Sequence, residues 1–285
     1  MITTEQELTR TGKQIRLSRI LNQQDQRAAV VAFDHGMHVG LIPGVEHPGR
    51  MLETLAESGA DAFLVGPGVA QAFSSVFCGR GAPGMILRLD WSNRWRDPDA
   101  LGFEEGRTRV IMSVENAARI GADAVLVYMF LGYGDPQAEA DQVEAVARVI
   151  EQCDAVGIGC IVEPMARGKQ ADHDIYRADY IALGVRIACE LGADLLKTDY
   201  SGDARSFSQV TQASFRPILI AGGPRTPTLR EPLEMVRGAL DAGASGMFIG
   251  RNVFQTSAPA AAMKALAQMI HQDLSVDEAM ALVEA

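Results

Sequence analysis

Gly121-Ala122-Asp123-Ala124-Val125-Leu126-Val127 is one of four stretches in which a short glycine phrase leads into an apolar run. The same pattern begins at Gly59, Gly192 and Gly243, the last with serine in place of aspartate. A glycine followed by an apolar run is typical of a helix that ends in a left-handed residue and passes into a buried parallel strand. Four such junctions predict a repeating unit in which helix and strand alternate.

Four further apolar runs extend this pattern to eight candidate strands. The eight candidate strands lie at residues 28–33, 62–65, 85–89, 124–127, 159–162, 195–197, 217–220 and 246–249. Eight parallel strands separated by helical stretches predict a (β/α)₈ barrel, the TIM-barrel fold of the α/β class. A doubly wound open sheet is the structural alternative, because apolar runs alone do not fix the number of strands.

The stretches between the strands have helical patterns. Apolar residues recur at three- and four-residue spacing over residues 138–156 and 178–191, and Thr228-Leu229-Arg230-Glu231 and Ser275-Val276-Asp277-Glu278 resemble capping boxes. No Pro/Ser-rich linker divides the chain. We therefore expect a single domain over residues 1–285. Its N-terminal extension, residues 1–26, would contain a helix near residues 13–21, and residues 256–285 would form C-terminal helices.

Composition limits the classes of partner. A formal charge of −10 and a pI near 5.0 argue against a nucleic-acid or anionic-membrane partner. No window holds 18 uninterrupted apolar residues, and the N-terminus is polar. The four cysteines show no paired spacing, which indicates free thiols in a reducing cytoplasm. We expect a cytoplasmic protein.

Lys197 ends the sixth apolar run, where the chain is expected to be buried. A buried ammonium is costly without a partner, and burial favours the neutral, nucleophilic amine. Asp34 follows the first run and Glu163 follows the fifth. Because active sites of this fold gather at the carboxyl ends of the strands, these three side chains are expected to meet in one pocket suited to Schiff-base chemistry.

Each of these residues also has a structural interpretation. Lys197 could reach solvent or pair with Asp199. Asp34 could cap the following loop, and Glu163 could be a structural partner of Arg88 or Lys197.

Glycines follow the last two strands. Gly222 and Gly223 come after the seventh, and Gly250 and Arg251 come after the eighth, which are the positions where barrels commonly bind phosphate. Tight turns that need glycine for backbone conformation alone are the alternative. His35 and His38 lie close to Asp34, but the histidines form no ligand motif with the spacing of a metal site. We expect no metal and no other cofactor.

Several of these stretches resemble the archaeal-type class I Schiff-base aldolase family, in order along nearly the whole chain. They are Gly12-Lys13-Gln14-Ile15-Arg16-Leu17-Ser18-Arg19-Ile20, Asp34-His35-Gly36, Leu196-Lys197-Thr198-Asp199-Tyr200-Ser201-Gly202-Asp203, Ile220-Ala221-Gly222-Gly223-Pro224 and Ile249-Gly250-Arg251-Asn252-Val253-Phe254-Gln255. The family includes fructose-bisphosphate aldolases, aminodideoxyheptulosonate synthases and a thiolase that degrades a phosphorylated autoinducer.

The resemblance implies a metal-independent enzyme in which Lys197 forms the Schiff base and Asp34 does acid–base work. Relatives form homo-oligomers, including decamers, and a similar assembly is expected here. The residues that match phosphate- or substrate-binding stretches of the family are Ser201, Gly202, Gly222, Gly223, Gly250, Arg251 and His35.

One departure from the family concerns the proton donor. The fructose-bisphosphate and heptulosonate enzymes have Tyr-Pro-Arg-Gly at the end of the fifth strand, where this chain has Met165-Ala166-Arg167-Gly168. Methionine cannot transfer a proton. Glu163 stands two residues earlier on the same strand face, so we expect it to take over this role. Arg88 and Tyr128 are secondary candidates for contacting the sugar or a second anionic group, unless they fill the barrel and pair with Asp90 or Glu163.

These observations predict a class I aldolase that reversibly cleaves a phosphorylated ketose, fructose-bisphosphate-like, to dihydroxyacetone phosphate and an aldehyde. Acyl or ketol transfer of the thiolase or transaldolase type, and cleavage of a tagatose bisphosphate or a sulfosugar phosphate, are the enzymatic alternatives. A phosphosugar-binding protein on an aldolase barrel is the non-enzymatic one. Substrate choice is expected to depend on the loops at residues 91–98 and 132–137.

Overall fold

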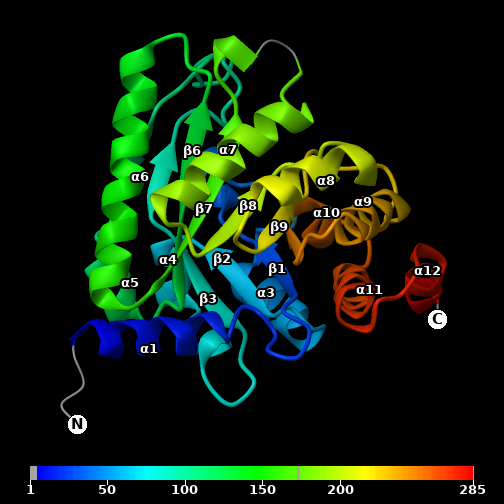
Figure 1. Cartoon of the computed structure of the whole chain (residues 1–285). Coiled ribbons are helices and arrows are strands. Elements are labelled where there is room, and N and C mark those ends of the chain that lie inside the picture. The colour runs from blue at the N-terminus through cyan, green and yellow to red at the C-terminus, as the bar shows by residue number, and fades with distance from the viewer. Residues whose placement is uncertain (1–4, 172–173, 285) are drawn as a thin grey trace.

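A closed barrel of eight parallel strands forms the centre of the molecule (Figure 1). The computed structural model describes residues 5–171 and 174–284. Around the barrel the strands follow the order β1, β10, β9, β8, β7, β6, β3, β2 and back to β1. Their bounds are β1 (Ala28–Ala32), β2 (Ala62–Val65), β3 (Gly84–Arg88), β6 (Ala124–Leu131), β7 (Gly159–Ala166), β8 (Leu195–Thr198), β9 (Ile218–Ala221) and β10 (Gly246–Ile249). The predicted (β/α)₈ barrel is confirmed, and the open sheet was the wrong alternative.

Helices cover the outside of this barrel (Figure 1). Those that precede or follow the strands are α2 (His35–Val39), α3 (Pro48–Glu57), α4 (Pro67–Ala72), α5 (Val114–Ile120), α6 (Pro136–Val156), α7 (Ala178–Leu191), α8 (Ala204–Ala213), α9 (Arg230–Asp241) and α10 (Arg251–Phe254), with 3-10 turns at Ser74–Phe77 and Lys169–Ala171. The C-terminal helices are α11 (Pro259–Gln272) and α12 (Val276–Glu284). Within the described residues, no helix has both the length and the apolar character needed to cross a membrane.

The predicted left-handed glycines and one of the two predicted capping boxes are confirmed. The four junction glycines have left-handed backbone: φ is 98° at Gly59 and Gly121, 104° at Gly192 and 96° at Gly243. Glu278 accepts a hydrogen bond from the Ser275 backbone and donates its own N–H to the Ser275 hydroxyl, so this capping box is complete. At the other, Thr228 donates to Glu231 Oε2, but the N-cap residue of α9 is Leu229 and its side chain makes no capping bond.

The N-terminal helix differs from the prediction in its bounds. Helix α1 spans Glu5–Leu17 rather than residues 13–21, and it lies across the amino-terminal end of the barrel (Figure 1). Its first half is polar and shows no apolar period. Contacts with distant residues hold it instead: Lys13 pairs with Asp154 and, at 2.8 Å, with Asp194, and Arg16 Nη1 donates to the Gly157 carbonyl at 2.7 Å.

A short antiparallel hairpin was not predicted. Strands β4 (Asp90–Ser92) and β5 (Thr108–Val110) pair after β3, in a region expected to be loop. Trp91 Nε1 donates to the Met37 carbonyl at 2.9 Å, which packs the hairpin onto the rim of the barrel. The strands are only three residues long, so their apolar pattern is too short to recognise.

Alternation along the strands separates the core into two layers. Val30, Leu64 and Leu126 belong to the cluster inside the barrel, whereas their neighbours Val31 and Phe63 belong to the larger cluster between strands and helices. Because successive side chains of a strand point to opposite faces, every second residue continues the inner layer towards the carboxyl end. The inner apolar layer therefore determines which polar residues reach the site above it.

A histidine clamp lies at the opposite, amino-terminal end of the barrel. His271 contacts Asp25 through Nδ1 at 2.7 Å and Asp61 through Nε2 at 2.9 Å, and Asp61 also accepts from the Ala29 backbone. The hydrogen bond to Asp61, together with that to Asp25, raises the pKa of His271 to about 9. The protonated ring thus joins α11 to the segments before β1 and β2.

This clamp predicts a pH-dependent stability. Because the pKa of His271 is raised on folding, its contribution is complete below about pH 6.5 and is lost as the pH rises through about 9. The ring is partly solvated, so we expect the loss to be about 1–2 kcal/mol of unfolding free energy. Urea unfolding at both pH values would measure it. His271→Gln should flatten the profile, whereas His47→Gln, at an exposed histidine, should leave it steep.

Candidate active site

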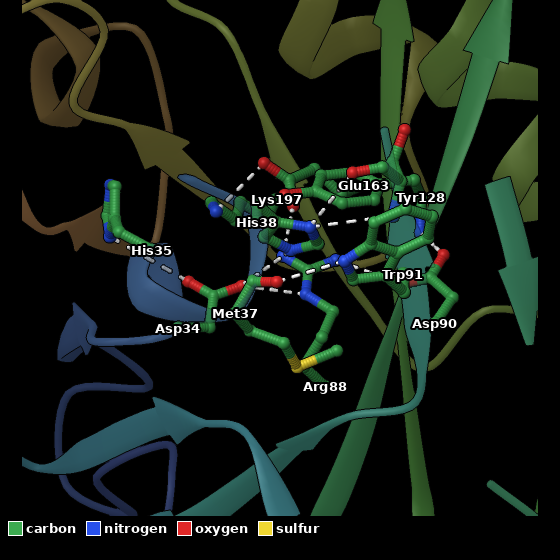
Figure 2. Close-up of polar contacts among 11 residues, drawn as sticks. Asp34, His35, Met37, His38, Arg88, Asp90, Trp91, Tyr128, Glu163 and Lys197 are labelled. Atoms are coloured by element: carbon green, nitrogen blue, oxygen red, sulfur yellow. Dashed lines mark hydrogen bonds and ion pairs between the residues drawn. The ribbon is translucent and has the colours of Figure 1, made fainter. Parts of the chain in front are cut away.

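The polar residues of the site are the next inward-facing layer of the barrel. Lys197 stands two residues after the inner Leu195, Glu163 two after Ile161, and Arg88 two after Ile86. Tyr128 on β6 and Asp34, just beyond β1, continue the same alternation. The structure therefore brings five residues singled out in the sequence to one place, at the carboxyl end of the strands (Figure 2).

A cavity of about 500 Å³ opens above this layer. Lys197, Glu163, Asp34, His35 and Tyr128 line it. The chain contains four lysines, and Lys197 is the one that lines this cavity. Its side chain is 8% exposed, and Nζ lies 4.8 Å from the centre of the Phe248 ring.

Glu163 lies between the lysine and an arginine. Its Oε1 is 2.8 Å from Lys197 Nζ, and its Oε2 is 3.0 Å from Arg88 Nη2 (Figure 2). Glu163 therefore pairs with both residues that the sequence offered as its structural partners. One of its carboxylate oxygens, Oε1, is in direct contact with the Lys197 amine. Lys197 does not pair with Asp199, whose carboxylate contacts Arg167 Nη2 at 2.8 Å instead.

Asp34 forms the second carboxylate of the site. Its Oδ2 accepts from Arg88 Nε at 2.7 Å and lies 3.7 Å from His38 Nε2. Burial alone would raise the pKa of Asp34, but the charges of Arg88 and Lys197 and the contact with His38 outweigh it and hold the pKa well below its usual range. Asp34 is thus an ionised carboxylate in the unliganded protein.

His35 is a neutral member of the site. Burial, reinforced by the nearby charges of Lys197 and Arg251, lowers its pKa to about 4 although Asp34 opposes this. Burial likewise raises the pKa of Tyr128, so its phenol remains protonated. In residues 5–171 and 174–284, no three His, Cys, Asp or Glu side chains are arranged to hold a metal ion.

Arg88 is completely buried beneath the cavity and does not line it. Besides Asp34 and Glu163 it contacts Asp90, with Nη1 3.4 Å from Oδ1, and its guanidinium lies 3.8 Å from the centre of the Tyr128 ring. The position of Arg88 therefore does not support the expected contact between Arg88 and a substrate in the cavity. Arg88 instead connects the two carboxylates that face the cavity.

This arrangement predicts a large loss of stability when Arg88 is removed. Arg88→Met would leave three buried carboxylates without their common cation, and breaking a buried ionic cluster in this way costs about 3–5 kcal/mol of unfolding free energy. Chemical denaturation would measure the change. Arg119→Met, at an exposed arginine paired with Glu115, should cost less than about 1 kcal/mol. Equal effects of the two substitutions would contradict the role of Arg88.

The glycine turns line one side of the cavity. Gly222, Gly223 and Gly250 face it together with Arg251, whose Nη2 donates to the Gly223 carbonyl at 2.9 Å. A side chain at Gly250 would bring its Cβ 2.5 Å from the Ala32 carbonyl, so packing also requires this glycine. The family-derived positions Ser201 and Gly202 lie outside the cavity lining; the Ser201 hydroxyl contacts that of Ser206 at 2.8 Å.

Further polar residues that the sequence analysis did not propose as site residues also line the cavity, among them His38, Arg167, Tyr176 and Asp199. Met165 and Trp95 line it as well, and Trp95 belongs to the loop expected to influence substrate choice. Trp95 packs on Tyr128 with ring centres 5.6 Å apart, which places the predicted loop at residues 91–98 against the site. The sequence contained a signal for His38: it lies four residues after Asp34, the N-cap residue of the short helix α2, and side chains at this spacing lie on the same face of a helix.

Comparison with known proteins agrees with this geometry. The model of the DeoC/LacD aldolase family matches residues 28–256, which include all eight barrel strands. The chain belongs to the DeoC/LacD family of aldolases. It is 37% identical over 273 residues to an uncharacterized aldolase of Saccharolobus solfataricus, covering 96% of this chain and 99% of that one. It is 36% identical to the 2-amino-3,7-dideoxy-D-threo-hept-6-ulosonate synthase of Halobacterium salinarum, covering 96% and 97%.

A solved structure shares the fold of this aldolase. An archaeal fructose-1,6-bisphosphate aldolase, with its catalytic lysine covalently bound to the carbinolamine intermediate, superposes with a TM-score of 0.78 at 27% identity. The match covers 90% of this chain and 99% of that one. The predicted family, fold and enzyme class are therefore confirmed.

Proposed function

We propose that this aldolase reversibly cleaves a phosphorylated ketose to dihydroxyacetone phosphate and an aldehyde through a Schiff base at Lys197. The observation that supports this most directly is the 2.8 Å contact between Lys197 Nζ and Glu163 Oε1 inside the cavity. An amine beside a carboxylate has both the nucleophile and the proton acceptor of this chemistry. The covalent intermediate of the archaeal neighbour, formed on its lysine, supports the same type of reaction.

The reaction begins at the keto carbon. Glu163 takes a proton from the Lys197 ammonium, and the free amine adds to the carbonyl to form a carbinolamine. Glu163 returns this proton to the carbinolamine hydroxyl, which leaves as water, so a protonated imine (the iminium) forms and Glu163 is ionised again. The ionised Asp34, near the lysine, stabilises the positive charge of this iminium.

Carbon–carbon cleavage follows from the iminium. A carboxylate removes the proton of the hydroxyl group β to the iminium carbon, the bond between the α and β carbons breaks, and the aldehyde leaves. The electron pair of that bond forms the enamine. Protonation of the enamine carbon and addition of water then release dihydroxyacetone phosphate and the free lysine. We assign the hydroxyl proton to Glu163, because its Oε1 lies 2.8 Å from Lys197 Nζ, the atom that bears the substrate; Asp34 is the alternative.

Trapping tests this proposal. The protein would be incubated with borohydride and, in turn, fructose 1,6-bisphosphate, fructose 1-phosphate, tagatose 1,6-bisphosphate and a sulfosugar phosphate, while dihydroxyacetone phosphate is assayed. A reduced adduct at Lys197 in the peptide mass spectrum, with release of dihydroxyacetone phosphate, is the expected result. An adduct without cleavage would favour a binding protein, coenzyme A consumption with a phosphorylated dione would favour a thiolase, and no adduct with any of them would count against the proposal.

A further inference from the structure

The charges around the cavity are paired in a way that selects among phosphorylated ketoses. Three cations of the described residues line the cavity: Lys197, Arg167 and Arg251. Lys197 is paired with Glu163 and Arg167 with Asp199, at 2.8 Å in both cases. Arg251 forms no ion pair with any described carboxylate, and its guanidinium donates a hydrogen bond to the Gly223 carbonyl. Among the described residues that line the cavity, one cation is therefore outside an ion pair and can bind an incoming anion.

The available cation lies at one end of the cavity. Arg251 follows β10, and in the closed barrel β6 stands four strands away from β10 in both directions, which is diametrically opposite. Lys197 on β8 lies two strands from each. A phosphate at Arg251 and a keto carbon at Lys197 therefore direct the remaining carbons of the substrate towards β7 and β6. Glu163 on β7 then lies beside the carbons where cleavage occurs.

At the end of the cavity near β6 and β7 the lining is aromatic, and no described cation that lines it is outside an ion pair. Tyr128, Trp95 and Met165 form one apolar cluster there, and Tyr128 stacks on Phe130 with ring centres 4.8 Å apart. Arg94 lies 5.7 Å from the centre of the Phe130 ring but does not line the cavity. Arg167 is the cation that lines this side, and its ion pair with Asp199 is buried, with side chains 9% and 3% exposed. A second phosphate would have to displace Asp199 or lie unpaired beside it, and both are unfavourable.

Building on the proposed function, we propose that the substrate of this aldolase is a ketose monophosphate, with its phosphate at Arg251 and an uncharged aldehyde half against Tyr128 and Trp95. The 1,6-bisphosphates that the family resemblance suggested are disfavoured. Aromatic faces suit the C–H surface of an uncharged sugar chain, and the protonated Tyr128 phenol can bind its hydroxyls.

A paired kinetic comparison tests this inference. Each ketohexose 1-phosphate (fructose, tagatose and sorbose) would be compared with its own 1,6-bisphosphate, measuring kcat/KM for dihydroxyacetone phosphate and borohydride adducts at Lys197. We expect the kcat/KM of the best of the three monophosphates to exceed that of its own bisphosphate by about ten-fold or more. Adducts with equal or higher kcat/KM for the bisphosphates would overturn the inference and leave the proposed function intact. Absence of adducts from all six compounds would overturn both.

A substitution tests the reason for this preference. Asp199→Asn removes the charge that occupies Arg167, so the ratio of monophosphate to bisphosphate kcat/KM should fall by about ten-fold. Asp241→Asn, at an exposed carboxylate paired with Arg237, should leave the ratio unchanged. An unchanged ratio in folded Asp199→Asn would overturn the pairing argument. Thermal unfolding establishes that the variant is folded, and if it is not, the wild-type ratio decides alone.

Discussion

Lys197→Met should abolish cleavage, with kcat falling by at least about 10⁴-fold. The thioether has a similar length but cannot add to a carbonyl, so neither the carbinolamine nor the iminium can form. Arg88 remains to neutralise Glu163 in this variant, since its Nη2 contacts Oε2 at 3.0 Å. We therefore expect the loss of activity without a comparable loss of stability. Dihydroxyacetone phosphate release and borohydride trapping would measure the first, and thermal unfolding the second.

Lys264→Met is the matched control for this substitution. Lys264 lies exposed on α11, and the same change there should leave both turnover and trapping at the wild-type level. Lys197→Arg keeps a cation beside Glu163 but cannot form a Schiff base, so it should be as inactive as Lys197→Met. Substantial turnover by either Lys197 variant would contradict the assignment of the nucleophile, because the chain has no second lysine in the cavity.

The barrel could be predicted because its determinants are local. Each αβ junction needs a left-handed glycine followed by a buried strand, and both are visible in a few consecutive residues such as Gly121 to Val127. Helix α1 and the β4–β5 hairpin were misplaced or missed for the opposite reason. Lys13 and Arg16 hold α1 through residues more than 130 positions away, and no local pattern records such contacts.

The site was predictable to the extent that strand alternation determines it. Lys197 and Glu163 each follow an inner apolar residue by two, so their convergence follows from the sequence pattern and the barrel. Their partners do not follow from it. Whether Arg88 reaches the substrate or lies beneath it, and whether Asp199 pairs with Lys197 or Arg167, depends on side-chain packing between strands. The aromatic side of the cavity depends on the loop containing Trp95, whose path the pattern does not define.

Glu163→Gln should reduce kcat by about 10²–10⁴-fold while borohydride trapping at Lys197 persists. The amide keeps the size of the side chain but cannot accept a proton from the substrate hydroxyl, so cleavage is slowed. It also cannot accept the proton of the Lys197 ammonium, so the adduct should form more slowly; water can take that proton, and the final amount of trapped adduct should reach that of the wild type. A residue with a purely structural role would show the reverse pattern: adduct formation and turnover would fall together. Single-turnover trapping, with dihydroxyacetone phosphate measured in the same samples, separates the two.

Met165 makes this experiment decisive for how the chain performs the family's chemistry. The family resemblance implies a tyrosine at this position in the fructose-bisphosphate and heptulosonate enzymes, whereas here a thioether stands two residues beyond Glu163 on the same face of β7. If Glu163 has taken over the proton transfer, Met165→Tyr in the Glu163→Gln background should restore part of the lost kcat, because a phenol would again be present. Glu190→Gln, an exposed carboxylate paired with Arg186, should lose nothing and gain nothing from Met165→Tyr. Full activity of Glu163→Gln alone would contradict this role of Glu163 and assign the proton transfer to Asp34, the other carboxylate held by Arg88.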